Sequence, residues 1–123
     1  MTKEVKYDDK WKAEGYTNIK NPVLFDEYLS TRAKIIYFQL LARDFSGDKI
    51  SYPNQNTIAE ENGVTPKTVQ RAMKELEEGG LIEIKHRYNS SNLYIMKDIT
   101  DRYPQFKEKK EALSDVDYYA DLK

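Results

Sequence analysis

Basic and amide side chains recur at Lys67, Gln70, Arg71 and Lys74, and no acidic residue occurs between positions 63 and 74. An arginine can donate two hydrogen bonds to the edge of a guanine, and a glutamine can pair in the same two-point manner with adenine. A lysine pairs with a phosphate as a compact point charge. The chemistry that these residue types offer is therefore the binding of anions and of planar hydrogen-bonding edges.

A second basic stretch lies at positions 84–97, which contain Lys85, Arg87 and Lys97 and no acid. The chain as a whole is nearly neutral, with 20 basic and 21 acidic residues among 123. The two stretches are thus local features, because bulk charge gives no sign of a polyanionic partner. A short basic run is usually a solvated face, so its place in the fold must decide whether it binds anything.

Catalytic and metal chemistry are poorly supported by the sequence. The chain has no cysteine and a single histidine, His86, so nitrogen and sulfur ligands for zinc cannot be assembled. Its five glycines, at positions 15, 47, 63, 79 and 80, form no phosphate-binding loop. We therefore expect no enzymatic activity, no metal, no cofactor and no small-molecule substrate.

A first helix is predicted from Ser30 to Phe45. Ser30 is a good N-cap, and apolar residues follow it at steps of three and four. These residues are Ala33, Ile36, Tyr37, Leu40 and Leu41. Residues 46–48 should end the helix, and residues 49–52 should form a short extended segment before Pro53.

Two further helices are predicted on either side of a tight turn. An asparagine can cap a helix over residues 54–61, and Gly63 suits the left-handed conformation that ends it. Thr65 and Pro66 then supply a capping hydroxyl and a proline at the first helical position, starting a helix that runs to Glu78. The buried side of this third helix should carry Val69, Ala72, Met73 and Leu76.

A hairpin follows, because residues 81–88 and 93–96 alternate around the polar turn 89–92. Two helices that cross steeply need a small residue and a glycine at the crossing, which Ala59 and Gly63 provide. The order of helix, short strand, helix, turn, helix and hairpin predicts an α+β, mainly α, fold. This is the winged helix-turn-helix, a three-helix core with a C-terminal β-hairpin wing.

The two ends of the chain are expected to lie outside this domain. Residues 1–15 are predicted to be a flexible arm, and residues 16–97 the winged domain, with a short strand at 16–19. Residues 98–123 form a charged, tyrosine-rich extension for which two short helices, 106–113 and 116–122, are plausible. We expect this extension to order against the domain or a second subunit and to contribute cooperativity rather than base contacts. The alternative is a disordered acidic tail.

The segment 52–82 resembles the winged helix-turn-helix domains of phage and plasmid replication initiator proteins, and residues 16–22 and 29–34 are similar to the lead-in of that family. The likeness covers roughly residues 16–96. It implies a DNA-binding fold. Because initiators usually continue into a larger second domain, a chain that stops at Lys123 is expected to be an accessory or regulatory DNA-binding protein.

Within this fold the third helix should enter the major groove with its N-terminal residues foremost. Arg71 and Gln70 are the candidates for reading bases, and Lys67 and Lys74 for binding phosphates. The full set predicted for this helix is Thr65, Lys67, Thr68, Gln70, Arg71 and Lys74. Asn54 and Gln55, at the start of the preceding helix, are predicted to bind phosphate. The predicted wing contacts are Lys85, His86, Arg87, Tyr88, Asn89 and Ser90.

The sequence thus favours a cytoplasmic, sequence-specific binder of double-stranded DNA from a plasmid or phage, without membrane association. Replication, DNA transfer and partition are the expected processes. Two alternatives stay open: a transcriptional repressor, and a winged helix that binds other proteins within a replisome or segrosome. A homodimer would fit paired half-sites.

Overall fold

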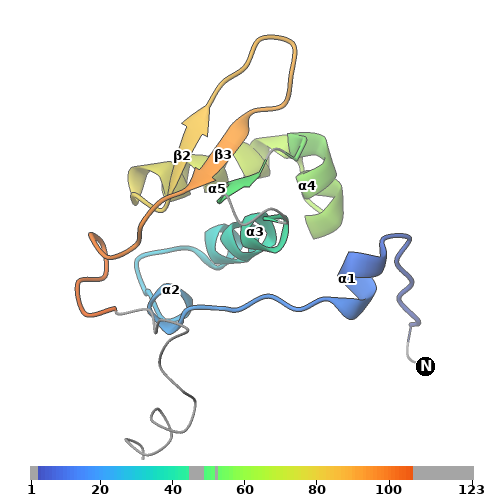
Figure 1. The fold of residues 1–123 in the computed structure, drawn as a ribbon. Coiled ribbons are helices and arrows are strands. Elements are labelled where there is room, and N and C mark those ends of the chain that lie inside the picture. The colour runs from blue at the N-terminus through green and yellow to red at the C-terminus, as the bar shows by residue number, and fades with distance from the viewer. Residues whose placement is uncertain (1–2, 45–48, 52, 107–123) are drawn as a thin grey trace, which may run out of the picture.

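The computed structural model describes residues 3–44, 49–51 and 53–106. Helix α5 (Pro66–Glu78) lies at the centre of the fold. It packs against α3 (Thr31–Ala42) and α4 (Gln55–Asn62), and its C-terminal end leads into the sheet (Figure 1). The three helices are those predicted from hydrophobic spacing. Together with the hairpin they form an α+β, mainly helical domain, and the winged helix-turn-helix prediction is confirmed.

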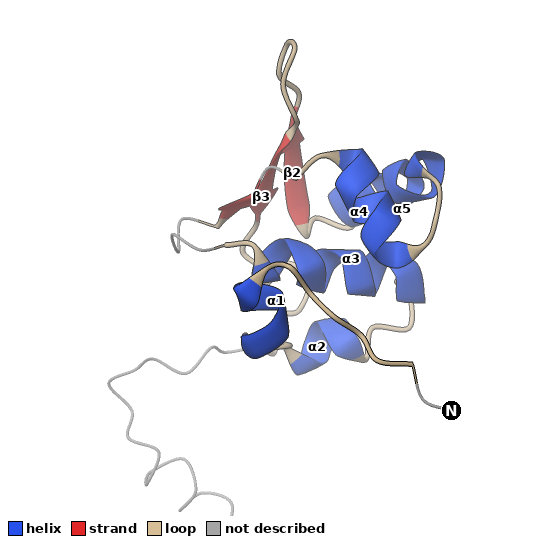
Figure 2. Cartoon of the chain, turned by 90° about the vertical axis from the view of Figure 1, so that its right-hand side faces the viewer, coloured by secondary structure: helices blue, strands red, loops and turns tan. Residues whose placement is uncertain are grey.

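A three-stranded antiparallel sheet closes one side of the helices. It consists of β1 (Ile50–Ser51), β2 (Ile82–Lys85) and β3 (Leu93–Met96), with β3 in the centre. Strands β2 and β3 are the arms of the predicted hairpin, whose loop projects away from the helices in both views (Figures 1 and 2). The extended segment before Pro53 pairs with β3, so it becomes the third strand.

The predicted caps fix where the helices begin. The Ser30 hydroxyl accepts a hydrogen bond from the backbone N–H of Ala33, and the Thr65 hydroxyl accepts one from that of Thr68. The Asn54 side chain accepts from the N–H of Asn56. Gly63 ends α4 at φ 63°, the left-handed region in which any side chain would be strained.

The core lies between the helices and the sheet. All four residues predicted for the inner face of α5 are buried, together with Tyr37, Phe38 and Tyr94. At about 25 cal/mol for each Å² of apolar surface, a fully buried side chain of this size contributes roughly 1.5–3 kcal/mol. This burial fixes which face of α5 remains available.

The N-terminal segment differs from the prediction in two ways. Residues 16–19 form no strand, since Tyr16 and Ile19 are exposed and no strand of the described sheet pairs with them. Residues expected to be a flexible arm include a short helix, α1 (Lys10–Glu14), and a second short helix, α2 (Asn21–Leu24), follows before α3. Both lie on the side of α3 away from the wing (Figures 1 and 2).

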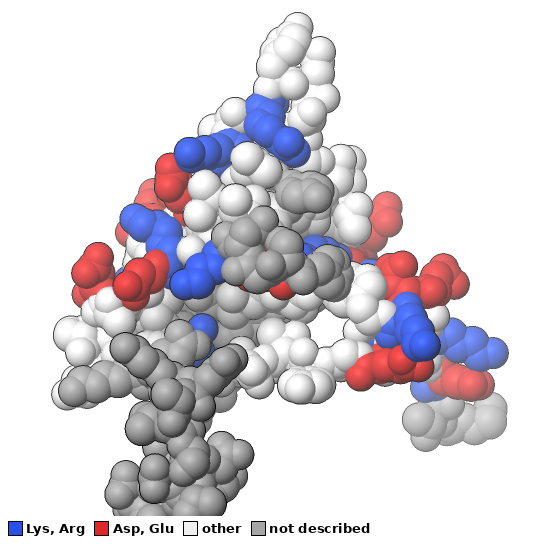
Figure 3. Space-filling model, in the orientation of Figure 1, with Lys and Arg blue, Asp and Glu red and all other residues white. Residues whose placement is uncertain are grey.

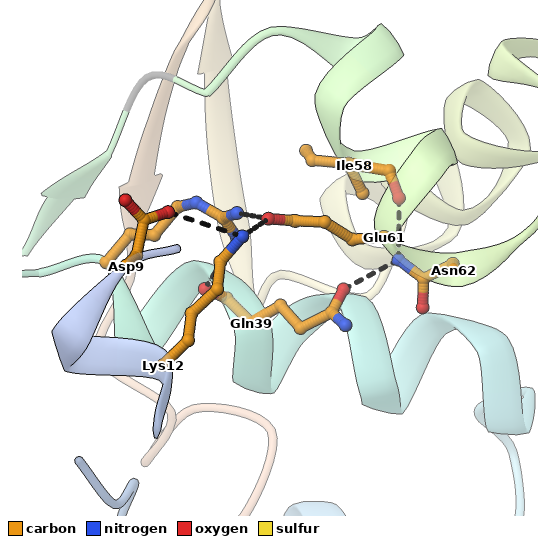
Figure 4. A network of polar contacts seen from close by, with 7 residues as sticks. Asp9, Lys12, Gln39, Ile58, Glu61 and Asn62 are labelled. Carbon is orange, nitrogen blue, oxygen red and sulfur yellow. Dashed lines mark hydrogen bonds and ion pairs between the residues drawn. The ribbon is translucent and has the colours of Figure 1, made fainter. Parts of the chain in front are cut away.

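An ion network attaches α1 to the helix-turn-helix (Figure 4). Lys12 Nζ lies 2.6 Å from a carboxylate oxygen of Glu61 on α4, and Arg43 at the end of α3 donates to the same oxygen. Burial alone would raise the pKa of Glu61, but the hydrogen bonds from Lys12 and Arg43 outweigh it and lower that pKa. Asn62 extends the network by donating to the Gln39 side chain at 2.7 Å.

A second polar cluster attaches the segment that follows β3. Asp26 Oδ2 accepts from Arg102 Nε at 2.8 Å and from the Tyr103 hydroxyl at 2.7 Å, while Arg102 also donates to the Gly79 carbonyl at the end of α5. Ile99 is buried in the core. Packing therefore continues beyond residue 97 as far as Phe106. Apart from Phe106, the two predicted extension helices, 106–113 and 116–122, lie outside the described residues.

The Asp26 cluster makes stability depend on pH. Burial raises the pKa of Asp26, but the hydrogen bonds from Arg102, Tyr103 and the Tyr28 N–H together lower it below its ordinary value. A carboxyl group with a lowered folded-state pKa stabilises the fold above its unfolded pKa, near 3.9, and loses that contribution as the pH falls through the folded value.

Asp26→Asn should therefore lower the free energy of unfolding at pH 7 by about 1–3 kcal/mol, because Arg102 loses its charged acceptor. Below about pH 4 the difference between the variant and the original chain should shrink. Urea denaturation at pH 7 and pH 3 measures both effects. Asp101→Asn, at an exposed position nearby, is the control. Equal destabilisation by Asp26→Asn at both pH values would contradict the assignment.

Candidate nucleic-acid interface

The outward face of α5 carries the predicted recognition residues. Lys67, Gln70, Arg71 and Lys74 are all exposed, on the side opposite the buried Val69, Ala72, Met73 and Leu76. Lys74 lies 4.0 Å from Glu78 one turn later, a surface pair that contributes little to stability and leaves the ammonium group accessible. The same amphipathic pattern that buries one face thus presents a basic and amide surface on the other.

The two threonines predicted at the start of α5 have a structural role. Thr65 caps the helix through its hydroxyl, and its oxygen lies 3.2 Å from that of Thr68. Their hydroxyls are thus engaged with each other and with the helix end. For an anion this end offers the Lys67 N–H and the positive end of the helix dipole, because Pro66 has no N–H and the N–H of Thr68 donates to Thr65.

At the start of α4 the two predicted phosphate ligands have different surroundings. Asn54 is exposed but its side-chain oxygen is engaged as the helix cap. Gln55 is half-buried and lies between two other side chains, since its oxygen accepts from Gln70 and its nitrogen donates to the Tyr94 hydroxyl. The structure therefore places Gln55 against Gln70 of the recognition helix. The two residues are 15 positions apart, and nothing in the sequence indicated this contact.

The wing hairpin exposes all six residues predicted for it, positions 85 to 90. Arg87 Nε donates to the Ser91 carbonyl at 2.7 Å across the hairpin loop, and Asn89 adopts φ 55°, a left-handed turn position that asparagine tolerates. Figure 3 shows Lys and Arg side chains at the base of the wing and only uncharged residues at its tip. The basic groups thus lie at the base of the wing, and its tip carries amide and hydroxyl side chains.

These three parts meet in one polar groove of about 260 Å³, lined by the starts of α4 and α5 and by the wing loop. Gln55 and Gln70 form part of its wall. Five lining residues were not predicted as contacts: Asn56, Pro66, Ser91, Asn92 and Tyr94. Polar turn composition could have indicated the two wing residues, whereas Tyr94 reads in the sequence only as a core residue.

The comparison with known families agrees with this geometry. Residues 27–82 match a family model described as a helix-turn-helix domain. The chain carries a winged helix-turn-helix domain. Such a domain indicates DNA as the partner. No curated protein and no solved structure matches the chain significantly.

Metal-binding clusters and membrane-spanning helices are absent from the described part of the chain. No group of three or more histidine or acidic residues there could hold a metal ion. No helix among those residues is long and apolar enough to cross a membrane.

Changing Lys85 and Arg87 together to alanine should weaken DNA binding without changing the preferred sequence, because charges at the base of the wing act on phosphates. The dependence of affinity on salt should also become shallower, by up to about two units in slope. Electrophoretic titrations over a salt series measure both quantities. The matched control changes Lys10 and Arg32, which are exposed cations away from the groove. An altered sequence preference would instead show that the wing reads bases.

Proposed function

We propose that this protein binds double-stranded DNA sequence-specifically, with α5 in the major groove and the wing against the adjacent backbone or minor groove. One observation carries the proposal: the exposed face of α5 holds Lys67, Gln70, Arg71 and Lys74, and its N-terminal end opens into the groove shared with α4 and the wing. A major groove admits one helix, and a helix-turn-helix domain inserts the N-terminal part of its second helix.

Each side chain on this face has a distinct role in the proposal. Arg71 reads a guanine through O6 and N7, and Gln70 reads an adenine. Lys67 and Lys74 bind phosphates and set the register of the helix. No catalytic step, metal or cofactor is part of this function.

The resemblance to phage and plasmid replication initiators supports a role in replication, DNA transfer or partition, as an accessory or regulatory factor. Transcriptional repression is the alternative within the same class, since a repressor uses the same contacts. Footprinting across the intergenic regions next to the gene would distinguish them: protection at an origin favours replication, and protection over a promoter favours repression.

Arg71→Ala and Lys74→Ala test the recognition face as a pair. Arg71→Ala should remove the preference for the cognate duplex, at a cost of about 1–3 kcal/mol in binding free energy. Lys74→Ala should weaken cognate and random duplexes alike, and should reduce the salt slope by about one unit.

Fluorescence anisotropy with both duplexes at about 150 mM salt, where non-specific binding is weak, measures these effects. Arg32→Ala, an exposed arginine at the start of α3, is the control. If Arg71→Ala binds both duplexes as the original chain does, the face assigned to DNA is the wrong one.

A second candidate function is assembly with another protein chain, including a second copy. It is favoured by a groove of about 1060 Å³ between α2 and the segment 102–106, where Phe25 and Tyr28 are 76% and 82% exposed. Aromatic side chains left this exposed are typical of interaction surfaces. Two subunits on paired half-sites would multiply a weak single contact.

Residues 98–123 were expected to provide such cooperativity, and most of them lie outside the described residues. Because Ile99 and Arg102 are part of the packed domain, the test is a chain that ends at Phe106. It should bind a single half-site with unchanged affinity and lose cooperative binding to paired sites. If the truncated and full chains bind paired sites with equal cooperativity, the extension has no part in assembly.

A further inference from the structure

A chain of three side chains links the core of the domain to the recognition face. The hydroxyl of Tyr94 on β3 lies 3.4 Å from Gln55 Nε2, which donates to it, and Gln55 Oε1 accepts from Gln70 Nε2 at 3.1 Å. Tyr94 is fully buried, Gln55 is half-buried and Gln70 is exposed. The relay thus runs from the interior of the sheet, through the first residue of α4, to the outer face of α5.

The hydrogen bond to Gln55 uses only part of the Gln70 amide. A glutamine amide has two N–H donors and a carbonyl oxygen with two lone pairs. With one N–H given to Gln55, Gln70 keeps one N–H and its carbonyl oxygen. An adenine in the major groove needs one donor for N7 and one acceptor for its N6 amino group, which is the set that remains.

Holding the amide in place also changes the cost of binding. A free glutamine side chain on a helix surface samples several rotamers, and ordering it on DNA costs free energy. The Gln55 contact fixes the position of the Gln70 amide before DNA arrives. The buried tyrosine in turn restricts where Gln55 lies, because a half-buried amide bonded to a rigid core side chain has few alternatives.

We infer that Gln55 and Tyr94 are positioning residues that orient Gln70 to read an adenine, so that selectivity at one base pair depends on a side chain of α4. This rests on the proposed function and replaces the phosphate-binding role expected for Gln55. A phosphate ligand would affect all sequences equally, whereas a positioning residue acts only at the base pair that Gln70 reads.

The test compares base preference among four single variants. The sites preferred by the original chain are first selected from a random duplex library, and Gln70→Ala identifies the position that Gln70 reads. Gln55→Leu, Tyr94→Phe and the control Asn18→Leu, an exposed amide outside the relay and outside both grooves, are then measured by anisotropy. The probes are the selected duplex and duplexes substituted at each position, and a thermal melt of every variant checks folding.

Gln70→Ala should reduce discrimination at one A·T pair by about 5- to 150-fold. Gln55→Leu should reduce it at that same pair by about 2- to 10-fold, and Tyr94→Phe by a smaller factor, with other positions unchanged. In the Gln70→Ala background, Gln55→Leu should have no further effect, since the two residues act as one unit. Asn18→Leu should bind as the original chain does.

Three results would overturn the inference. Equal weakening of all duplexes by Gln55→Leu would make Gln55 a phosphate ligand, and unchanged selectivity in Gln55→Leu would mean that Gln70 needs no support. A Gln70→Ala variant with full selectivity would show that Gln70 reads no base. In these cases the original chain still selects a sequence, so DNA binding stands. If the original chain selects no sequence at all, the proposed function fails together with the relay.

Discussion

The burial of one face of α5 is the constraint on which the rest of the structure depends. Val69, Ala72, Met73 and Leu76 pack against α3, α4 and the sheet, so the helix cannot rotate about its axis without exposing apolar surface. The opposite face must then face outward. The basic and amide side chains that it carries owe their accessibility to the core, because nothing in their own chemistry would select one orientation of the helix.

Polar contacts between distant segments set the position of α5 along its axis. Glu75 Oε2 accepts from the Ser30 backbone N–H at 2.7 Å, which places an acidic group of α5 at the positive end of α3. At the same, C-terminal, end of α5, Arg102 donates to the carbonyl of Gly79. Glu75 lowers the net positive charge of α5, but it also holds this helix against α3.

The wing and α4 complete the surface by meeting α5 at its N-terminal end. The sheet holds the wing through Tyr94, whose hydroxyl also contacts Gln55, so a single buried residue connects two of the elements that line the groove. In the proposed function few side chains contact bases, so selectivity would depend on how rigidly each one is held. The structure supplies that rigidity through the fold.

The sequence by itself determined the features that depend on neighbouring residues. Helix caps, the glycine at position 63, the spacing of buried residues in α5 and the alternation of the hairpin are local patterns, and all of them hold in the structure. The exposed face of α5 followed from the same period.

Only the tertiary structure decided the contacts between distant segments: the attachment of α1 through Glu61, the Asp26–Arg102 pair across 76 residues, and the Gln55–Gln70 bond. Such contacts leave no periodic signal, because they depend on where the packed helices bring side chains together. The alternating apolar and polar residues 16–19 form no strand, because a strand also needs the edge of another strand to pair with, and that edge comes from a distant part of the chain.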